Sequence, residues 1–286
     1  MKVLVLGGGQ IARAVSAAAP RNHQVVSRTH ADLDIVDEHA VARALSEVKA
    51  DWVVNAAAYT AVDLAEDQSG QAYAVNDTAV ASLAHASSRA GCRLLHLSTD
   101  FVFDGNSSRA YLPTDPTNPL GVYGASKLAG ERHVLDGNVG IVLRTSWVYA
   151  AQGKNFVLTM LRLMREKDRI SVVCDQIGTP TWAASAAAAI WGLIDADAAT
   201  GIYHWTDLGV ASWYDFAVAI QDEALERGLL SRAVNILPIS SAAYPTRAKR
   251  PSFSVLDTAA TRALLNLPTR HWRHNLREMV DEIRAE

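Results

Sequence analysis

A tyrosine and a lysine four residues apart, Tyr123 and Lys127, form the pair in this sequence whose types and spacing best suit chemistry. They lie in Tyr123-Gly124-Ala125-Ser126-Lys127, where a helix is expected to begin. Residues i and i+4 of a helix share one face, with Cβ atoms about 5–6 Å apart. A phenol has a pKa of about 10, and a neighbouring cation lowers that pKa. Tyr123 is therefore a candidate general acid or base, although the spacing taken alone favours a surface tyrosine and a solvated lysine.

Thr99 is the second residue whose type and place suit catalysis. It belongs to Ser98-Thr99-Asp100, which follows a predicted strand at residues 93–98 and precedes Tyr123 by 24 residues. A hydroxyl at the end of that strand can hydrogen-bond a substrate carbonyl oxygen beside the phenol and stabilise developing negative charge. Taken singly, a threonine there is more typical of a turn hydroxyl that caps backbone.

A glycine-rich turn near the N-terminus predicts a nucleotide site. An apolar run at residues 3–6 has the length of a buried strand, Gly7-Gly8-Gly9 follows it, and residues 10–19 have the pattern of a helix. Gly7, Gly9 and Ala12 fit the spacing G-x-G-x-x-G/A, in which backbone N–H groups approach a pyrophosphate at the helix N-terminus. A turn that merely connects the two elements is the alternative.

Arg28 bears on which dinucleotide would bind. It follows a predicted second strand at residues 24–27, where NAD-specific sites usually place an acid against the ribose 2′-hydroxyl. Arg28 instead faces a 2′-phosphate or is an exposed loop arginine, and the sequence supports the two equally. After the next strand, residues 52–55, three alanines at positions 56–58 leave room for a flat ligand or reflect tight packing.

Alternating strands and helices predict an α/β fold with a doubly wound parallel sheet of the Rossmann type. Helices are expected at residues 38–48, with Asp37 as N-cap, and at 71–89, and a further strand at 139–144. Beyond Trp147 the alternation loosens. We expect residues 1–148 to form a dinucleotide-binding domain to which 178–206 return, and residues 149–177 and 207–286 to form a smaller C-terminal substrate-binding lobe.

Composition excludes several classes of function. The chain has 286 residues, 49% hydrophobic content and a formal charge of −3, which gives no basic footprint for nucleic acid. The alanine-rich run at 183–194 is too short to span a bilayer, and the N-terminus lacks the layout of a signal peptide. Cys92 and Cys174 match no metal or redox spacing, and the nine histidines are scattered. We therefore expect a cytoplasmic protein without a metal site.

Set in order, several segments of the chain resemble the extended short-chain dehydrogenase/reductases. The most specific are residues 55–63, 97–105, 122–131, 143–149 and 175–181, together with Arg250-Pro251, Ser254 and Leu256. So many segments in one order are far more specific than any one of them. The glycine turn departs from the family pattern, which usually has one more residue, and the last thirty residues carry little family signal.

The resemblance implies a set of site residues. Thr99, Tyr123 and Lys127 would be catalytic, and Asp100 and Trp147, with Thr99, would bind the substrate. The residues implied for the cofactor are, from pyrophosphate to nicotinamide, Gly7, Gly9, Gln10, Ile11, Arg28, Asp34, Ile35, Ala57, Ala58, Tyr59 and Thr60, with Tyr123 and Lys127. Lys127 would hold the cofactor ribose and lower the pKa of Tyr123 towards 7, which requires roughly 4 kcal/mol.

The resemblance further implies a reductase that transfers a hydride from NADPH or NADH to the C4 keto group of a dTDP-linked 4-keto-6-deoxy sugar, with dTDP-4-dehydro-L-rhamnose as the expected substrate. An epimerase or 4,6-dehydratase of the same superfamily is one alternative. Dehydratases carry an Asp-Glu pair after the catalytic threonine, whereas Thr99 precedes Asp100 and Phe101. A non-catalytic regulatory subunit is another, against which the intact Thr99, Tyr123 and Lys127 argue. A homodimer is left open.

Overall fold

A six-stranded, entirely parallel sheet forms the centre of the computed structural model, which describes residues 1–268 and 270–285. Its strand order is β10-β5-β4-β3-β1-β2. The strands are β1 (Lys2–Leu6), β2 (Gln24–Arg28), β3 (Trp52–Asn55), β4 (Arg93–Thr99), β5 (Gly140–Thr145) and β10 (Gly201–His204). The order reverses between β1 and β3, and open α/β sheets bind ligands in the crevice at the carboxyl ends of such strands. The predicted doubly wound parallel sheet is confirmed.

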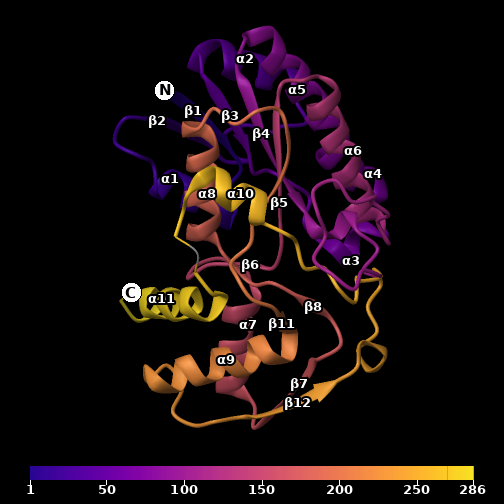
Figure 1. Ribbon diagram of the computed structural model, residues 1–286, viewed down its shortest axis with the longest axis vertical. Helices are drawn as coiled ribbons and strands as arrows, with labels where there is room; N and C mark the ends of the chain where they lie inside the picture. The colour runs from indigo at the N-terminus through magenta and orange to yellow at the C-terminus, as the bar shows by residue number, and fades with distance from the viewer. Residues whose placement is uncertain (269, 286) are drawn as a thin grey trace.

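Helices cover both faces of this sheet, as Figure 1 shows. On one face α1 (Gln10–Ala17) and α8 (Ala183–Asp195) pack together over Val3, Val5 and Ile141. On the other lie α2 (Glu38–Val48), α5 (Ala79–Ala90) and α6 (Val122–Asp136), which bury the side chains of Leu4 and Leu6. The apolar runs of β1 and β3 are continuous, without alternation, because both of their faces are covered.

Local signals explain where several helices begin and end. The Asp37 carboxylate accepts from the backbone N–H of Ala40 at 2.9 Å, as expected of the N-cap of α2. The helix predicted at 71–89 is not continuous, however. It consists of α4 (Ser69–Tyr73), a π-helical turn (Ala74–Thr78) and α5, which ends at the left-handed Gly91. The turn carries Asn76, whose buried amide bonds the Tyr59 backbone, and single π-turns often occur at functional sites.

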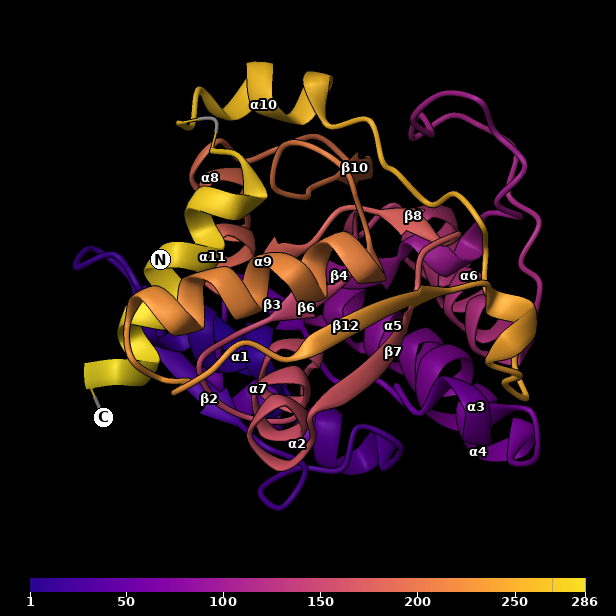
Figure 2. The same cartoon turned by 90° about the horizontal axis from the view of Figure 1, so that it is seen from below.

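A second hydrophobic core lies beyond the carboxyl ends of the sheet. It joins α7 (Phe156–Glu166), α9 (Trp213–Glu226) and α11 (Trp272–Ala285) around buried Met160, Phe216 and Leu276. Beside them β7 (Arg169–Val173) runs parallel to β12 (Asn235–Ile239), as Figure 2 shows from below. We therefore propose the division expected from the sequence, with 1–148 and 178–206 around the sheet and the remainder as a substrate-binding lobe.

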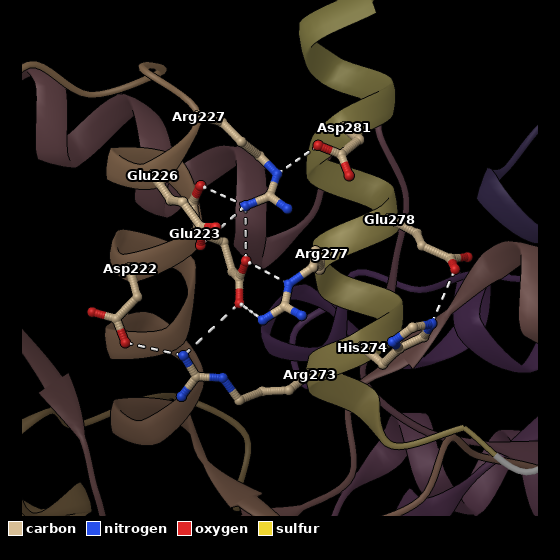
Figure 3. Close-up of polar contacts among 9 residues, drawn as sticks. All are labelled: Asp222, Glu223, Glu226, Arg227, Arg273, His274, Arg277, Glu278 and Asp281. Atoms are coloured by element: carbon tan, nitrogen blue, oxygen red, sulfur yellow. Dashed lines mark hydrogen bonds and ion pairs between the residues drawn. The ribbon is translucent and has the colours of Figure 1, made fainter.

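The last part of the chain, to which the sequence assigned no structure, contains α10 (Ala259–Leu265) and α11. Polar contacts fasten α11 to α9 around Glu223, which is 1% exposed (Figure 3). Its carboxylate lies 2.9 Å from the Arg227 guanidinium of its own helix and 3.2 Å from that of Arg277 on α11. The helix α11 therefore completes the core of the second lobe.

A strap, residues 244–258, connects the two parts along one side of the molecule (Figure 1). Isolated bridges join Ile177 to Phe253 and Tyr111 to Leu256. Its first part is a basic loop that carries Arg247, Lys249 and Arg250. This loop docks on the turn that carries α3 (Val62–Ala65), where Arg250 pairs with Asp63 at 2.7 Å and Arg247 pairs with Asp67. Two of the three basic residues of this loop are therefore engaged in ion pairs.

Short strand pairs link the lobe to the ends of the sheet. They join β6 (Val148–Tyr149) with β9 (Thr181–Trp182), and β8 (Ile177–Gly178) with β11 (Ala211–Ser212). Among the described residues, no helix combines the length and the apolar character needed to cross a membrane.

Candidate active site

The glycine turn lies at the point where the strand order reverses. Gly7 has a φ of +116°, and a Cβ there would lie 2.9 Å from the carbonyl carbon of Ala56 at the end of β3. Gly9 is the N-cap of α1, lacks a side-chain cap, and has open space where a Cβ would be. The first N–H groups of a helix have no intrahelical partner and favour anions. Gly7 is thus required by the fold, whereas Gly9 leaves room for a pyrophosphate.

Gln10, at the start of α1, connects this turn to the second lobe. Its Oε1 accepts from Nδ2 of Asn155 at 2.9 Å, and Asn155 also caps α7 by accepting from the backbone N–H of Leu158. Ile11 packs partly buried against the core beneath α1. Gln10 and Ile11 were expected at the cofactor from the resemblance, whereas Asn155 was not among the expected site residues.

The residues expected along the adenine and its ribose follow β2. The Arg28 guanidinium donates to the carbonyl oxygen of Ser27 at 3.2 Å. The nearby Asp32 carboxylate stabilises the turn, because it accepts hydrogen bonds from the backbone N–H and the hydroxyl of Thr29. Asp34 accepts from the backbone N–H of Val36 at 3.0 Å, and the Ile35 side chain is buried in the core. Arg28 therefore remains the candidate for a 2′-phosphate.

The segment that follows β3 is held by two buried asparagines. The Asn55 amide oxygen accepts from the backbone N–H of Ala57 at 3.2 Å. Asn76 accepts from the N–H of Tyr59 at 2.9 Å and donates to its carbonyl oxygen at 3.1 Å. The Tyr59 hydroxyl donates to Gln68, while Ala58 is partly buried and Thr60 is exposed. These bonds fix the backbone on the side where a nicotinamide is expected.

The structure brings together Thr99, at the end of β4, and Tyr123, in the first turn of α6. The Thr99 hydroxyl lies near enough to the Tyr123 phenol to lower its pKa, and the Phe101 ring packs edge-on against the phenol at 5.6 Å. The backbone N–H of Phe101 donates to Thr99 Oγ1 at 3.2 Å, which fixes that side chain. The Thr99 hydroxyl donates its proton to Oδ1 of Asp100 at 3.1 Å, so it can donate to a substrate carbonyl oxygen only after it rotates away from Asp100.

The expected lowering of the Tyr123 pKa is wrong for this structure. Burial raises the pKa of Tyr123 to about 12, the Thr99 hydroxyl opposes that rise, and the Asp100 charge adds to it. The Lys127 ammonium is directed elsewhere, because Nζ donates to the carbonyl oxygen of Leu97 at 2.7 Å and lies 3.1 Å from Nε2 of His96. A phenol with a raised pKa holds its proton at neutral pH and is suited to donate it.

Lys127 is itself strongly affected by its surroundings, since it is 2% exposed. Burial lowers the pKa of Lys127 to about 8, and the charge of Glu131 opposes that shift. Tyr123, Lys127 and Glu131 are spaced i, i+4 and i+8 on α6, so one stripe of the helix faces the strand ends. Glu131 anchors the stripe with two bonds to Arg144 of β5, at 2.9 and 2.6 Å, and accepts from Ser98.

Asp100 and Trp147 occupy the side expected for the substrate. Asp100 is 2% exposed and accepts from the Thr99 hydroxyl at 3.1 Å; burial raises its pKa to about 6, and the neighbouring Ser254 and Thr99 hydroxyls oppose that rise. Trp147 has a φ of +47°, which is an outlier for a bulky residue, and its indole stacks on Trp213 at 3.5 Å. Gly178 abuts that indole, because a Cβ there would lie 2.6 Å from it.

Residues 1–268 and 270–285 contain no group of three or more His, Cys, Asp or Glu side chains arranged to hold a metal ion. The site therefore consists of a helix N-terminus, two hydroxyls, a buried amine and a buried carboxyl. That set suits proton transfer to a carbonyl oxygen beside a bound dinucleotide.

The chain matches known proteins over nearly its whole length. The model of a family described as RmlD substrate binding domain matches residues 1–285. A dTDP-4-dehydrorhamnose reductase from Burkholderia thailandensis is 42% identical, with 96% of each chain covered. The crystal structure of such a reductase from Clostridium acetobutylicum superposes with a TM-score of 0.93 at 36% identity, covering 99% of this chain and 100% of the other.

A second solved structure, the dTDP-4-dehydrorhamnose reductase of Bacillus anthracis in complex with NADP, gives a TM-score of 0.93 at 33% identity, covering 98% of this chain and 99% of that one. The UDP-glucose 4-epimerase of Thermus thermophilus shares the fold at 20% identity. The chain therefore belongs to the RmlD family, that of the dTDP-4-dehydrorhamnose reductases.

Proposed function

We propose that this chain reduces the C4 keto group of a dTDP-linked 4-keto-6-deoxy sugar with NADPH, and that its substrate is dTDP-4-dehydro-L-rhamnose. The juxtaposition of Thr99 and Tyr123 carries the proposal, because Thr99 ends β4 and the glycine turn follows β1, so both lie at the carboxyl edge of the sheet, where open α/β sheets bind ligands. The names of the relatives support the sugar nucleotide, and the NADP complex of one of them supports the cofactor.

In this proposal each residue has a distinct task. The bound nicotinamide supplies the hydride, and the protein orients it and controls the proton. The N–H groups beside Gly9 and Gln10 bind the pyrophosphate, Arg28 faces the 2′-phosphate, and Lys127 binds the ribose. Tyr123 gives its proton to O4 of the sugar as negative charge develops there, and Thr99 donates a hydrogen bond to the same oxygen.

Asp100, Ser254 and Trp147 are proposed to border the sugar nucleotide. Asp100 bears on the dehydratase alternative, since elimination of water by that route uses two adjacent carboxylates and Phe101 occupies the second position. With a raised pKa of about 6, Asp100 is mostly ionised at pH 7.5, and its carboxylate can accept a hydrogen bond from a sugar hydroxyl.

The test is oxidation of NADPH followed by absorbance with a panel of dTDP-, UDP- and GDP-linked 4-keto sugars, repeated with NADH. We expect turnover with the dTDP-linked 4-keto-6-deoxy sugar and a product reduced at C4. A product formed without net oxidation of the cofactor would instead identify an epimerase or a dehydratase. The homodimer and the cytoplasmic location remain predictions, which light scattering and cell fractionation would test.

A further inference from the structure

Three buried polar side chains beneath the active site form one line of hydrogen bonds. Asn55 ends β3, His96 lies in the middle of β4, and Lys127 reaches them from α6. Nδ2 of Asn55 lies 3.1 Å from Nδ1 of His96, and Nε2 of the same ring lies 3.1 Å from Nζ of Lys127. Asn55 and His96 are both 0% exposed, so each polar atom must find its partner within this line.

The first bond of the line fixes the orientation of the Asn55 amide. The backbone N–H of Ala57 donates to Oδ1 of Asn55 at 3.2 Å. Since an N–H can only donate, the amide oxygen must face Ala57, and the NH₂ group must face the ring of His96. If the amide were rotated by 180°, its NH₂ group would face the backbone N–H of Ala57. Two buried donors would then face each other, and neither would have an acceptor.

The tautomer of His96 follows from that orientation. An NH₂ group facing Nδ1 requires Nδ1 to accept, so in a neutral imidazole the proton is on Nε2. Burial, and then the charge of Lys127, lower the pKa of His96 well below its usual range, which keeps the ring neutral. The Nε2–H group therefore points at Nζ of Lys127. A neutral amine can accept that bond and still donate to the Leu97 carbonyl oxygen, whereas an ammonium cannot accept it.

We propose that His96, held as the Nε2–H tautomer by Asn55, is a positioning residue that stabilises the neutral amine of Lys127 and directs its lone pair away from the cofactor site. The inference rests on the proposed function only for its consequence, namely that the affinity for NADPH depends on the protonation of Lys127. The tautomer itself stands on the hydrogen-bond geometry alone.

Other charges around Lys127 act in both directions. On α6, Glu131 favours the ammonium, although Arg144 of β5 neutralises much of its charge at 2.6 Å. Tyr123 on α6 is uncharged at neutral pH, and the Asp100 carboxylate lies in the turn after β4. The surroundings together favour the neutral amine of Lys127, as the bond from His96 does, because burial lowers the pKa of Lys127 to about 8.

The direct test is the ¹⁵N spectrum of histidine-labelled wild-type protein without ligands, in which the two ring nitrogens of each tautomer have distinct shifts. The His96 signal is assigned by its loss in His96→Gln. We expect a protonated Nε2 and an unprotonated Nδ1 at pH 9, where Lys127, with a pKa of about 8, is mostly the neutral amine. A protonated Nδ1 would overturn the proposal, and this measurement requires neither turnover nor cofactor binding.

The second test is the pH dependence of NADPH affinity, measured by fluorescence without substrate. In His96→Gln the amide oxygen can accept from an ammonium, so the midpoint assigned to Lys127 should rise by about one unit, a tenfold change. Asn55→Asp should shift it in the same direction, because a carboxylate favours the Nδ1–H tautomer and leaves Nε2 to accept.

The matched control is His133→Gln. His133 lies on the same helix but pairs with Asp77 at 2.6 Å, away from Lys127, and its replacement should leave the midpoint unchanged. Folded variants of His96 and Asn55 that keep the wild-type midpoint would refute the proposal. If no variant and no wild-type protein binds NADPH, the proposed function fails while the spectrum still decides the tautomer.

Discussion

Tyr123 is prepared as a proton donor by its surroundings. Its phenol lies among the Phe101 ring, the Thr99 hydroxyl and the Asp100 carboxylate, and burial outweighs the effect of the Thr99 hydroxyl in setting its pKa. In a reduction the phenol must be protonated when the hydride arrives, because the sugar oxygen then needs a proton. A raised pKa keeps the phenol protonated at neutral pH but makes it a weaker acid, and it makes the reverse oxidation dependent on high pH.

The first prediction concerns this hydroxyl pair. Tyr123→Phe should lower kcat by about 10²–10⁴-fold, because it removes the proton donor and keeps the ring that packs on Phe101. Thr99→Val should lower kcat by about 10²–10³-fold, as the loss of one donor to a developing oxyanion does. Stopped-flow reduction and titration with NADPH check both, with the dissociation constant unchanged in each. Near wild-type turnover by Tyr123→Phe would end the catalytic assignment.

The second prediction separates stability from function at Lys127. Its folded-state pKa, about 8, is below the ordinary lysine pKa of 10.5, so the unfolded chain binds more protons between those two pH values. Stability therefore rises with pH from about 8 to 10.5, and the cost of burying the charge is fully present below pH 8. Lys127→Met should be more stable than wild type at pH 7 by up to about 3 kcal/mol, while its affinity for NADPH falls.

Urea unfolding at pH 7 and at pH 10.5 measures this effect, and the difference between the two proteins should shrink at the higher pH. Lys154→Met is the matched control, because that lysine is exposed in the loop before α7 and its stability difference should not depend on pH. A Lys127→Met protein that is less stable than wild type at pH 7 would show that the bond to Leu97 outweighs the burial of charge.

At the scale of elements, the turn between β1 and α1 combines two glycines with different roles. Gly7 has a positive φ and lies against the backbone of Ala56, so the packing of the sheet requires glycine at this position. Gly9 has extended backbone dihedrals that any residue adopts, and no atom lies within 4 Å of a Cβ built there. If position 9 requires glycine, that requirement comes from a bound ligand and not from the fold.

The third prediction follows from that contrast. Gly7→Ala should destabilise the fold by several kcal/mol, because a Cβ would overlap Ala56 and Ala57 and the backbone conformation is strained. Gly9→Val should leave the melting temperature within a degree or two but lower NADPH affinity at least tenfold, because the side chain would fill the pyrophosphate space. A Gly9→Val protein with unchanged affinity would place the pyrophosphate elsewhere.

The extent to which the sequence predicts these elements depends on how local their causes are. Residues 38–48 and 52–55 have the predicted bounds, because an N-cap and an apolar run act within a few residues. The break at Ala74–Thr78 has a distant cause, since Asn76 bonds Tyr59 seventeen residues earlier. The His96 contacts span 41 and 31 residues, and a histidine inside an apolar strand was their only local signal.

The sign of the Tyr123 pKa could not be predicted for a related reason. Spacing places Lys127 near Tyr123, but the direction of Nζ depends on which acceptors β4 presents. The strap shows the same limit, because Ser254 reaches Asp100 across 154 residues of sequence and only the fold brings them together. Family resemblance located these residues without explaining their contacts.

At the scale of the whole molecule, the active site lies where two cores meet. The part around the sheet supplies the glycine turn, Thr99, Tyr123 and Trp147, and the second lobe holds the Trp147 indole through its stack on Trp213. The contacts between the parts include Gln10 with Asn155 and the strap on α3. Because each part has its own buried core, the stability of the lobe should be separable from the affinity for the cofactor.

The last prediction tests that separation through Glu223. Glu223→Ala should destabilise the second lobe by about 2–4 kcal/mol, because it removes a buried carboxylate that faces Arg227, Arg273 and Arg277 (Figure 3), two of which are half exposed and remain hydrated. Hydrogen exchange should quicken in α9 and α11 and stay unchanged in β1, β4 and β5, with NADPH affinity within twofold of wild type. Asp222→Asn is the control, since its exposed pair with Arg273 contributes less than about 1 kcal/mol. Faster exchange spread equally over the sheet and the lobe would instead mean that the chain unfolds as one cooperative unit, and the division into two parts would then describe only its shape.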